Sequence, residues 1–147
     1  MTDKNDEPKR ILDKNEAPLG EPARAALAAN LQKIRDRVAA ACARVKRDPQ
    51  GVQLVAVTKY SGVAFARALL DLGQRDLGEN RTEHLVTLAG ALRKEESEAA
   101  RAATGPRWHM VGHLQRNKAK EVANRLTALH SLDSLDLARK LVALRSA

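Results

Sequence analysis

Cysteine, aromatic residues and long apolar runs are scarce or lacking in this sequence of 147 residues. Its only cysteine, Cys42, has no second cysteine with which to form a disulfide inside the chain. No apolar run approaches the roughly 20 residues of a transmembrane helix, and the polar first segment lacks the apolar stretch of a signal peptide. We therefore expect neither a disulfide scaffold nor a membrane protein, and we predict a cytoplasmic location.

The scarcity of aromatic residues limits what the core can be made of. Phe, Tyr and Trp together make up 2% of the chain, although 44% of the residues are hydrophobic and 30% are charged. This composition is typical of a globular domain. Leu, Val and Ala must fill its core, and because alanine favours helices we expect a helix-rich domain.

Motifs for several kinds of chemistry are also absent. The sequence has no Walker glycine loop, no G-x-G-x-x-G fingerprint and no serine-centred elbow, and Cys42 lies inside a helical pattern. The histidines form no H-x-x-x-H pair on a helix, although His109 and His113 have this spacing across a strand and a loop. We predict no metal site and no nucleophilic hydrolase.

Positive charge is abundant, with 26 basic and 18 acidic residues and a net charge of +8. Such a balance attracts anions, from nucleic acids to small phosphate esters. Basic runs such as RNKAK and ARVKR make nucleic-acid binding one alternative function. The chain has few aromatic side chains on which bases could stack, so this alternative is disfavoured.

The chain begins with a polar segment and continues into a helical pattern. Residues 1–20 are charged and interrupted by proline and glycine, which predicts a flexible tail. From Glu21 onward, apolar residues recur at steps of three and four, with Pro22 in the first turn, and predict a long amphipathic helix. Its apolar stripe consists of Leu27, Leu31, Ile34, Val38, Ala41 and Val45.

After this helix, short apolar runs alternate with helical patterns, which indicates βα units and a parallel sheet. The predicted strands are 52–58, 75–78, 107–112 and 128–132. The predicted helices are 62–73, 81–102, 116–126 and 135–145. The expected fold is α/β, with about four βα units preceded by the long N-terminal helix.

Polar residues follow each predicted strand, at the end where parallel sheets bind their ligands. Lys59 follows the first strand, and the segments GEN, GHLQRNK and SLDS follow the next three. A lysine partly removed from water loses its proton more easily and can act as an imine-forming nucleophile. The alternative for Lys59 is an ordinary strand-end lysine whose amine extends into solvent.

Other polar side chains also have two interpretations. Asn80 could hydrogen-bond a ligand, or it could cap a helix, since Glu83 follows three residues later as in a capping box. We expect His109, on a buried strand, to be a hydrogen-bonded core residue and not a base. The loop residues that could position a ligand, or only end the strand and cap the next helix, are His113, Gln115 and Asn117. The lysines that could attract an anion, or only form a solvated helical face, are Lys118 and Lys120.

Four blocks of the sequence resemble a known family. LVAVTKY is followed in order by DLGEN, WHMVGHLQRNK and LHSLDSLDLARKL, and together they resemble the YggS/PROSC family of pyridoxal phosphate homeostasis proteins. The resemblance implies a TIM-type (β/α) barrel, similar to that of bacterial alanine racemase, with pyridoxal 5'-phosphate (PLP) as cofactor. It implies that Lys59 holds PLP as a Schiff base and that Asn80 lies beside the cofactor.

The resemblance implies a PLP-binding protein of vitamin B6 homeostasis more than an enzyme. Residues 21–147 would form a partial PLP-binding barrel with no catalytic residues, and PLP-dependent apoenzymes would receive the cofactor. The alternative is a fragment of a PLP-dependent amino-acid racemase-like enzyme. Tyr60 is a poor acid–base group for it, because neighbouring residues of a strand point to opposite faces.

The predicted strands are half of the eight that close such a barrel. In the family, the other half supplies a phosphate-binding serine and glycine loop and an arginine near the pyridine ring, and no residues here match them. We therefore expect a truncated chain or one half of a noncovalent assembly. Exposed sheet edges would favour self-association.

Overall fold

The computed structural model describes residues 16–93 and 104–145. Residues 1–15 of the predicted tail lie outside this range, and residues 16–20 have no regular secondary structure. The part of the predicted helix 81–102 that follows Arg93 is likewise outside the described residues. The described elements are α1 (Glu21–Arg44), η1 (Pro49–Gly51), β1 (Ala56–Val57), α2 (Val63–Asp71), β2 (Asp76–Glu79), α3 (Thr82–Arg93), β3 (Arg107–Met110), η2 (Arg116–Lys118), α5 (Ala119–Val122), β4 (Leu126–Leu129) and α6 (Leu135–Arg145).

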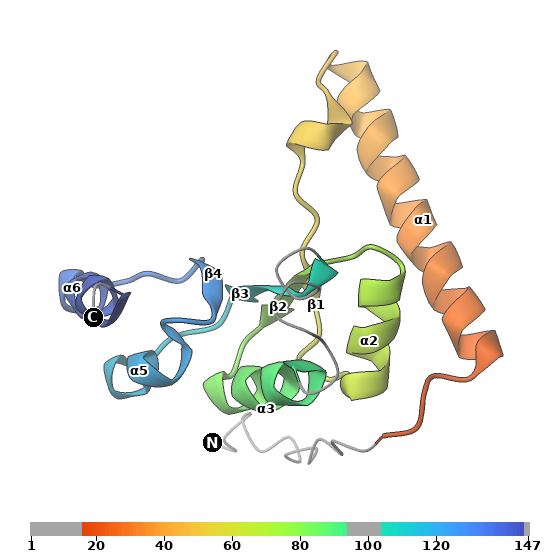
Figure 1. The fold of residues 1–147 in the computed structure, drawn as a ribbon. Helices are drawn as coiled ribbons and strands as arrows, with labels where there is room; N and C mark the ends of the chain where they lie inside the picture. Colours follow the sequence, from red (N-terminus) through yellow and green to blue (C-terminus); the bar gives the residue numbers. More distant parts are fainter. Residues whose placement is uncertain (1–15, 94–103, 146–147) are drawn as a thin grey trace, which may run out of the picture.

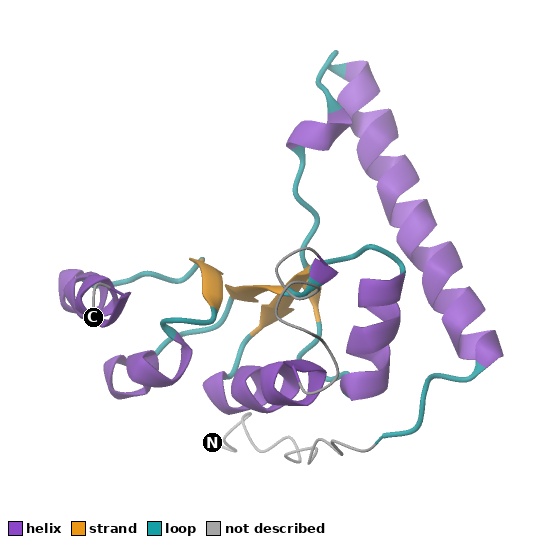
Figure 2. Ribbon diagram, viewed as in Figure 1, coloured by secondary structure: helices purple, strands orange, loops and turns teal. Residues whose placement is uncertain are grey.

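The described strands form one parallel sheet in the order β1-β2-β3-β4 (Figures 1 and 2). Ala56 of β1 lies opposite Leu77 of β2, and Leu77 lies opposite Trp108 of β3. Helices lie between successive strands, because a parallel neighbour requires the chain to return to the same end of the sheet. The predicted βα units are confirmed, and the fold is a partial (β/α) barrel preceded by a long helix.

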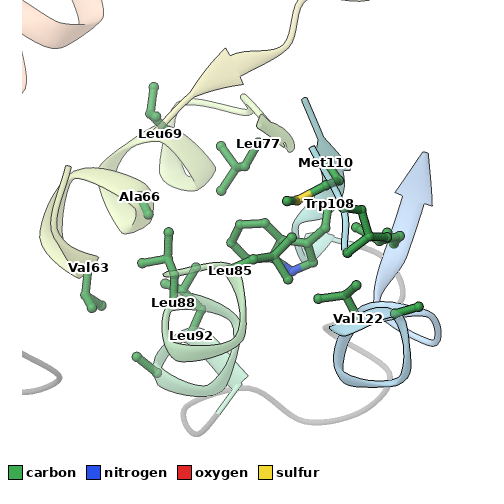
Figure 3. Packing of buried hydrophobic residues seen from close by; sticks show 14 of the residues in the cluster. Val63, Ala66, Leu69, Leu77, Leu85, Leu88, Leu92, Trp108, Met110 and Val122 are labelled. Atoms are coloured by element: carbon green, nitrogen blue, oxygen red, sulfur yellow. The ribbon is translucent and has the colours of Figure 1, made fainter. Parts of the chain in front are cut away.

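The hydrophobic core lies between the sheet and helices α2, α3 and α5 (Figure 3). Leu85, Leu88 and Leu92 recur at helical spacing and turn one side of α3 toward the sheet. They meet Leu77 and Trp108, which point from the strands into the same cluster. Burying one leucine side chain contributes about 1.5–3 kcal/mol. These contacts hold the strands, and therefore the loops that follow them, in place.

The opposite side of the sheet is more open, and we call it the inner face because in a closed barrel it would be the interior. Since successive strand residues alternate between faces, Gly78 and His109, which are opposite each other, lie on this side while Leu77 lies in the core. A Cβ atom on Gly78 would lie 3.1 Å from Val55 Cγ1 and 3.2 Å from Val57 Cγ2. Val57 remains 50% exposed, so the inner face is open to solvent there.

The first strand is shorter than predicted and covers Ala56–Val57 instead of 52–58. Side chains hold the residues before it. Gln74 Nε2 donates a hydrogen bond to Leu54 O at 2.7 Å, and Gln53 Nε2 donates one to Asp76 Oδ1 at 2.8 Å. These bonds fix residues 53 and 54 beside β2 without a backbone ladder.

The last strand begins earlier than predicted, at Leu126 instead of residue 128, and it ends at Leu129. Leu126 is 6% exposed and lies opposite Trp108, so its burial in the core starts the strand two residues early. The helix predicted at 116–126 is shortened for the same reason. It consists of the 3-10 turn η2 followed by the single α-helical turn α5.

Helix α1 forms as predicted, with Pro22 in its first turn, but only part of its apolar stripe is buried. Leu31 is buried, whereas Ile34 is 43% and Val45 is 70% exposed. In Figure 1, α1 stands apart from the sheet, with α2 between its first turns and the strands. An ion pair of 3.0 Å between Arg24 and Asp71 joins its first turns to the end of α2.

Candidate ligand site at the carboxyl ends of the strands

Lys59 lies in a turn directly after β1 and not in the strand itself. Thr58 N donates to Gly78 O at 2.9 Å, which continues the pairing of β1 with β2, and Ser61 N closes the turn on Thr58 O at 2.8 Å. The Lys59 side chain is exposed. Of the two interpretations of Lys59, the structure therefore fits the strand-end lysine whose amine extends into solvent, and not an amine partly removed from water.

Tyr60 also departs from the expectation that it points away from Lys59. The Lys59 Nζ atom lies 4.7 Å from the centre of the Tyr60 ring, within the range of a cation–π contact. Strand alternation does not apply here, because the strand ends at Val57 and both residues lie in the turn. The phenol ring, which is 57% exposed, gives the amine an aromatic neighbour.

Asn80 is not the cap of α3, as the capping-box pattern suggested. The helix begins at Thr82, and the Arg81 carbonyl accepts its first hydrogen bond, from Leu85 N at 3.1 Å. Arg81 is therefore the residue at the cap position, and half-buried Asn80 lies one residue further from the helix.

Gly112 brings the loop after β3 against the loop after β2. A Cβ atom at Gly112 would lie 2.2 Å from Asn80 O and 2.7 Å from Asn80 Cα, which is too close for any other residue. The Ser131 hydroxyl, after β4, donates to the Gly112 carbonyl. The loops after β2, β3 and β4 thus meet at the carboxyl ends of the strands.

Most other polar residues of the third sequence block have structural partners. Lys118 Nζ lies 3.3 Å from Glu83 Oε1 and 3.3 Å from Glu121 Oε1, and hydrogen bonds to these carboxylates raise the pKa of Lys118. His113 Nδ1 lies 3.0 Å from Asp133 Oδ2. The helical-face interpretation therefore fits Lys118 better than an anion site.

The remaining polar residues of this block line no common site. Gln115 and Asn117 are exposed, as is Lys120 just after the block, and Gln115 precedes η2 without a side-chain cap bond. Leu114, by contrast, is 1% exposed and anchors the loop in the core.

Away from the loops that follow the strands, the inner face carries a network of polar side chains around Asp76. Arg107 Nε donates to Asp76 Oδ1 at 2.8 Å and Arg107 Nη2 donates to Oδ2, while Gln53 and His109 also approach Oδ1. Burial acts to raise the pKa of Asp76, but the hydrogen bonds from Arg107, His109 and Gln53 outweigh it and hold this pKa below its ordinary value. Asp76 is therefore a carboxylate at neutral pH.

His109 is buried and hydrogen-bonded, as its position predicted, but it lies on the inner face and not in the hydrophobic core. It is 2% exposed, and its two ring nitrogens lie 2.9 Å from Asp76 Oδ1 and from His130 Nε2. Sequence analysis did not identify Asp76 or His130 as its partners. An acidic residue at the start of a buried strand was the signal that could have found Asp76.

Glu79 was also missed, although it stands inside the GEN segment. It is fully buried, accepts a hydrogen bond from the Thr58 hydroxyl, and lies 2.8 Å from His84 Nδ1 through its other oxygen. These contacts join the end of β1, the end of β2 and the first turn of α3. Buried Glu79 thus holds Thr58, just before Lys59, and the start of α3 together from the core side of the sheet.

Over residues 16–93 and 104–145, no group of three candidate ligands is arranged to hold a metal ion. Within the same ranges, no helix has both the length and the apolar character needed to cross a membrane.

No protein-family model matches the chain. The chain is similar to curated pyridoxal phosphate homeostasis proteins. It is 34% identical to that of Escherichia coli K12 over 115 residues, which is 78% of this chain and 47% of the relative. It is 32% identical to that of Mycobacterium leprae over 73% of this chain and 42% of the relative. The chain therefore spans about half the length of the curated relatives it matches.

Solved structures also resemble this chain. An unknown protein from Bifidobacterium adolescentis matches with a TM-score of 0.72 and 30% identity, over 89% of this chain and 54% of that protein. PipY from Synechococcus elongatus, in a structure with PLP bound, matches with a TM-score of 0.64 and 29% identity, over 82% and 48%. The PipY structure without PLP matches with the same TM-score.

Proposed function

Because the chain is homologous to pyridoxal phosphate homeostasis proteins over about half of their length, we propose that it binds PLP and acts in vitamin B6 homeostasis. One observation carries the proposal. The exposed Lys59 follows the carboxyl end of β1. The loops of Asn80 and Gly112, which contact each other, follow the carboxyl ends of β2 and β3 at the same end of the sheet. The PLP-bound PipY structure, which is similar to 82% of this chain, supports the choice of ligand.

Lys59 has the chemistry that a PLP aldehyde requires. Its amine condenses with the aldehyde carbon to form a C=N bond, and one water molecule is released. The amine is accessible, and a net charge of +8 favours the approach of an anionic phosphate ester. Asn80, which is not at the helix cap, is proposed to hydrogen-bond the pyridoxal ring oxygen or a water beside it.

The proposed role is to hold the cofactor and release it, with PLP-dependent apoenzymes as recipients and the cytoplasm as the location. A reaction on an amino acid would need an acid–base group held rigidly opposite the Lys59 amine. Tyr60, whose ring lies beside that amine, is 57% exposed and belongs to the same turn, so it is a poor group for this task. This arrangement favours binding over a defined reaction.

Self-association is part of the proposal, because β1 and β4 are both edge strands of the described sheet. Edge strands present unpaired backbone groups that pair readily with another chain. Near the β4 edge, Leu132 is 53% and Leu135 is 74% exposed, and on the inner face Val57 is 50% exposed. A second chain covering these side chains would remove apolar surface from water.

Lys59→Arg tests the cofactor proposal, because it keeps the positive charge and removes the primary amine. The wild-type protein mixed with PLP is expected to show a protonated-imine absorbance band. Borohydride reduction should then attach the label to Lys59, as read by peptide mass mapping. In Lys59→Arg the band and the label should fall to the level of a protein without PLP.

The matched control is Lys120→Arg, which changes another exposed lysine in the same way. This variant should keep both the band and the labelled Lys59 peptide. Label spread over many lysines in the wild type, or a band that survives in Lys59→Arg, would overturn the assignment of Lys59.

A further inference from the structure

Three polar side chains on the inner face form a continuous chain of hydrogen bonds. His109 Nε2 lies 2.9 Å from Asp76 Oδ1, and His109 Nδ1 lies 2.9 Å from His130 Nε2. The two imidazole rings are 5.2 Å apart between centres and tilted by 37°. These hydrogen bonds run from the first residue of β2, across β3, to the residue after β4. They therefore lead toward the carboxyl ends of the strands, where the candidate ligand site lies.

The carboxylate at the inner end fixes the position of every proton in this chain. Ionised Asp76 only accepts hydrogen bonds, so Nε2 of His109 must carry a proton and donate it. In neutral His109, Nδ1 is then the acceptor, and Nε2 of His130 must donate to it. Neutral His130 consequently keeps its lone pair on Nδ1, the ring nitrogen that the chain does not use.

An added proton must enter at that same nitrogen. When Nδ1 of His130 accepts a proton, the positive charge can stay on His130. It can also move to His109, if the proton on Nε2 of His130 crosses the hydrogen bond to Nδ1 of His109. In both forms Nδ1 of His130 carries the new proton. The two rings thus act as one acid–base unit with a single outer end.

Several charged groups surround these side chains, because Arg35 and Asp36 of α1 and Arg75 line one pocket together with Asp76 and Arg107. Asp76 of β2 and Arg107 of β3 face His109 with opposite charges, bonded to each other. In the loops after β3 and β4, His113 and Asp133 form their own pair of 3.0 Å. His130 itself is exposed, so its outer nitrogen can be reached from solvent.

We propose that Asp76, His109 and His130 form a proton relay whose outer end, Nδ1 of His130, exchanges protons with a ligand at the carboxyl ends of the strands. The fitting ligand class carries an ionisable hydroxyl or amine group. Asp76 and His109 are positioning residues, because they set the proton of His130 without reaching the edge. The relay rests on its own contacts and not on the cofactor proposed above.

Nuclear magnetic resonance of the full chain labelled with 15N, without any ligand, tests the relay. Above the pH at which the histidines are charged, both His109 and His130 should be in the Nε2–H form. A scalar coupling across the hydrogen bond should join Nδ1 of His109 to Nε2 of His130.

Two variants and an internal control sharpen the test. His109→Phe keeps a ring of similar size and should abolish the coupling, and Asp76→Asn should release His109 from a single tautomer. Neutral His113, whose Nδ1 lies 3.0 Å from Asp133 Oδ2, should be in the Nδ1–H form in the wild type and in both variants. Absence of the coupling in the wild type, or His109 in the Nδ1–H form, would overturn the relay even if a variant failed to fold. Because no PLP is present, either result is independent of the Lys59 experiment.

Discussion

At the scale of single residues, Asp76 is the polar side chain on which the inner face depends. It accepts hydrogen bonds from Gln53, before β1, and from Arg107 and His109, both in β3. A buried carboxylate without such partners would be costly, and each partner would lose a charged acceptor if the carboxylate were removed. Asp76 therefore ties the start of β2 to β3 and to the residues before β1.

Asp76→Asn should lower the free energy of unfolding at pH 7 by about 1.5–3 kcal/mol, the usual range for hydrogen bonds to a charged group. The pKa of folded Asp76 lies below that of an unfolded aspartate, near 3.9. Its contribution is therefore present above about pH 4 and is lost as the pH falls through the folded value. Urea unfolding at pH 7 and at pH 3 should show a smaller difference between the two proteins at pH 3.

The matched control is Asp71→Asn, which removes an exposed ion pair with Arg24. Pairs of that kind contribute about 0–1 kcal/mol. Equal losses in the Asp76 and Asp71 variants would contradict the central role of Asp76.

At the scale of elements, the candidate site depends on how closely the loops after the strands approach one another. Gly112 permits the contact between the loops after β2 and β3, because its missing Cβ leaves room for the backbone of Asn80. Helix α3 then starts at Thr82 and carries Leu85 into the core, which holds that loop from behind. Neither loop could be moved without disturbing the other.

Gly112→Ala should destabilise the fold by about 1–3 kcal/mol, as overpacking does, and should weaken ligand binding at the same edge. The new Cβ would meet backbone atoms of Asn80, which cannot rotate away as a side chain could. Thermal unfolding and PLP titration of the variant measure the two effects.

Gly90→Ala is the control, since Gly90 lies within α3 and a Cβ atom added there would meet nothing within 4 Å. The same substitution there should stabilise the helix by roughly 0.5–1 kcal/mol. A neutral Gly112→Ala would show that the two loops are free to separate.

At the scale of the whole molecule, the open parallel sheet leaves its two edge strands, β1 and β4, without a neighbouring strand in the described residues. Closed barrels of this type have eight strands, and edge strands are removed only by closure. The chain covers 48% of PipY and 54% of the Bifidobacterium structure, so both of those proteins have further residues beyond the matched part. This contrast underlies the proposed self-association.

Light scattering should give a mass above the 16.0 kDa of one chain, increasing with protein concentration. Leu135→Gln, which makes an exposed apolar residue near the β4 edge polar without changing charge, should reduce the associated fraction. Val45→Gln makes the same kind of change at the end of α1, where the side chain is 70% exposed, and should leave association unchanged. A monomer at all concentrations, or equal effects of both variants, would count against association through the sheet edge.

Several features followed directly from the residues. The step of three and four between apolar residues predicted α1, and the alternation of apolar runs with helical patterns predicted a parallel sheet with helices between its strands. Four blocks in order, LVAVTKY, DLGEN, WHMVGHLQRNK and LHSLDSLDLARKL, indicated the resemblance to pyridoxal phosphate homeostasis proteins, and the chain is similar to curated proteins of that name. Such features depend on neighbours in the sequence, so local patterns are sufficient to predict them.

Other features were decided only by tertiary contacts. β1 shrinks to Ala56–Val57 because Gln53 and Gln74 bond across to neighbouring segments, and β4 starts early because Leu126 is buried beside Trp108. Asn80 is separated from the helix cap, and Asp76, His109 and His130 are joined across three segments. The sequence by itself determined which elements form and that Lys59 follows the first strand. Which polar groups meet was decided by the register of parallel strands, since residues more than twenty positions apart become neighbours only when the sheet assembles.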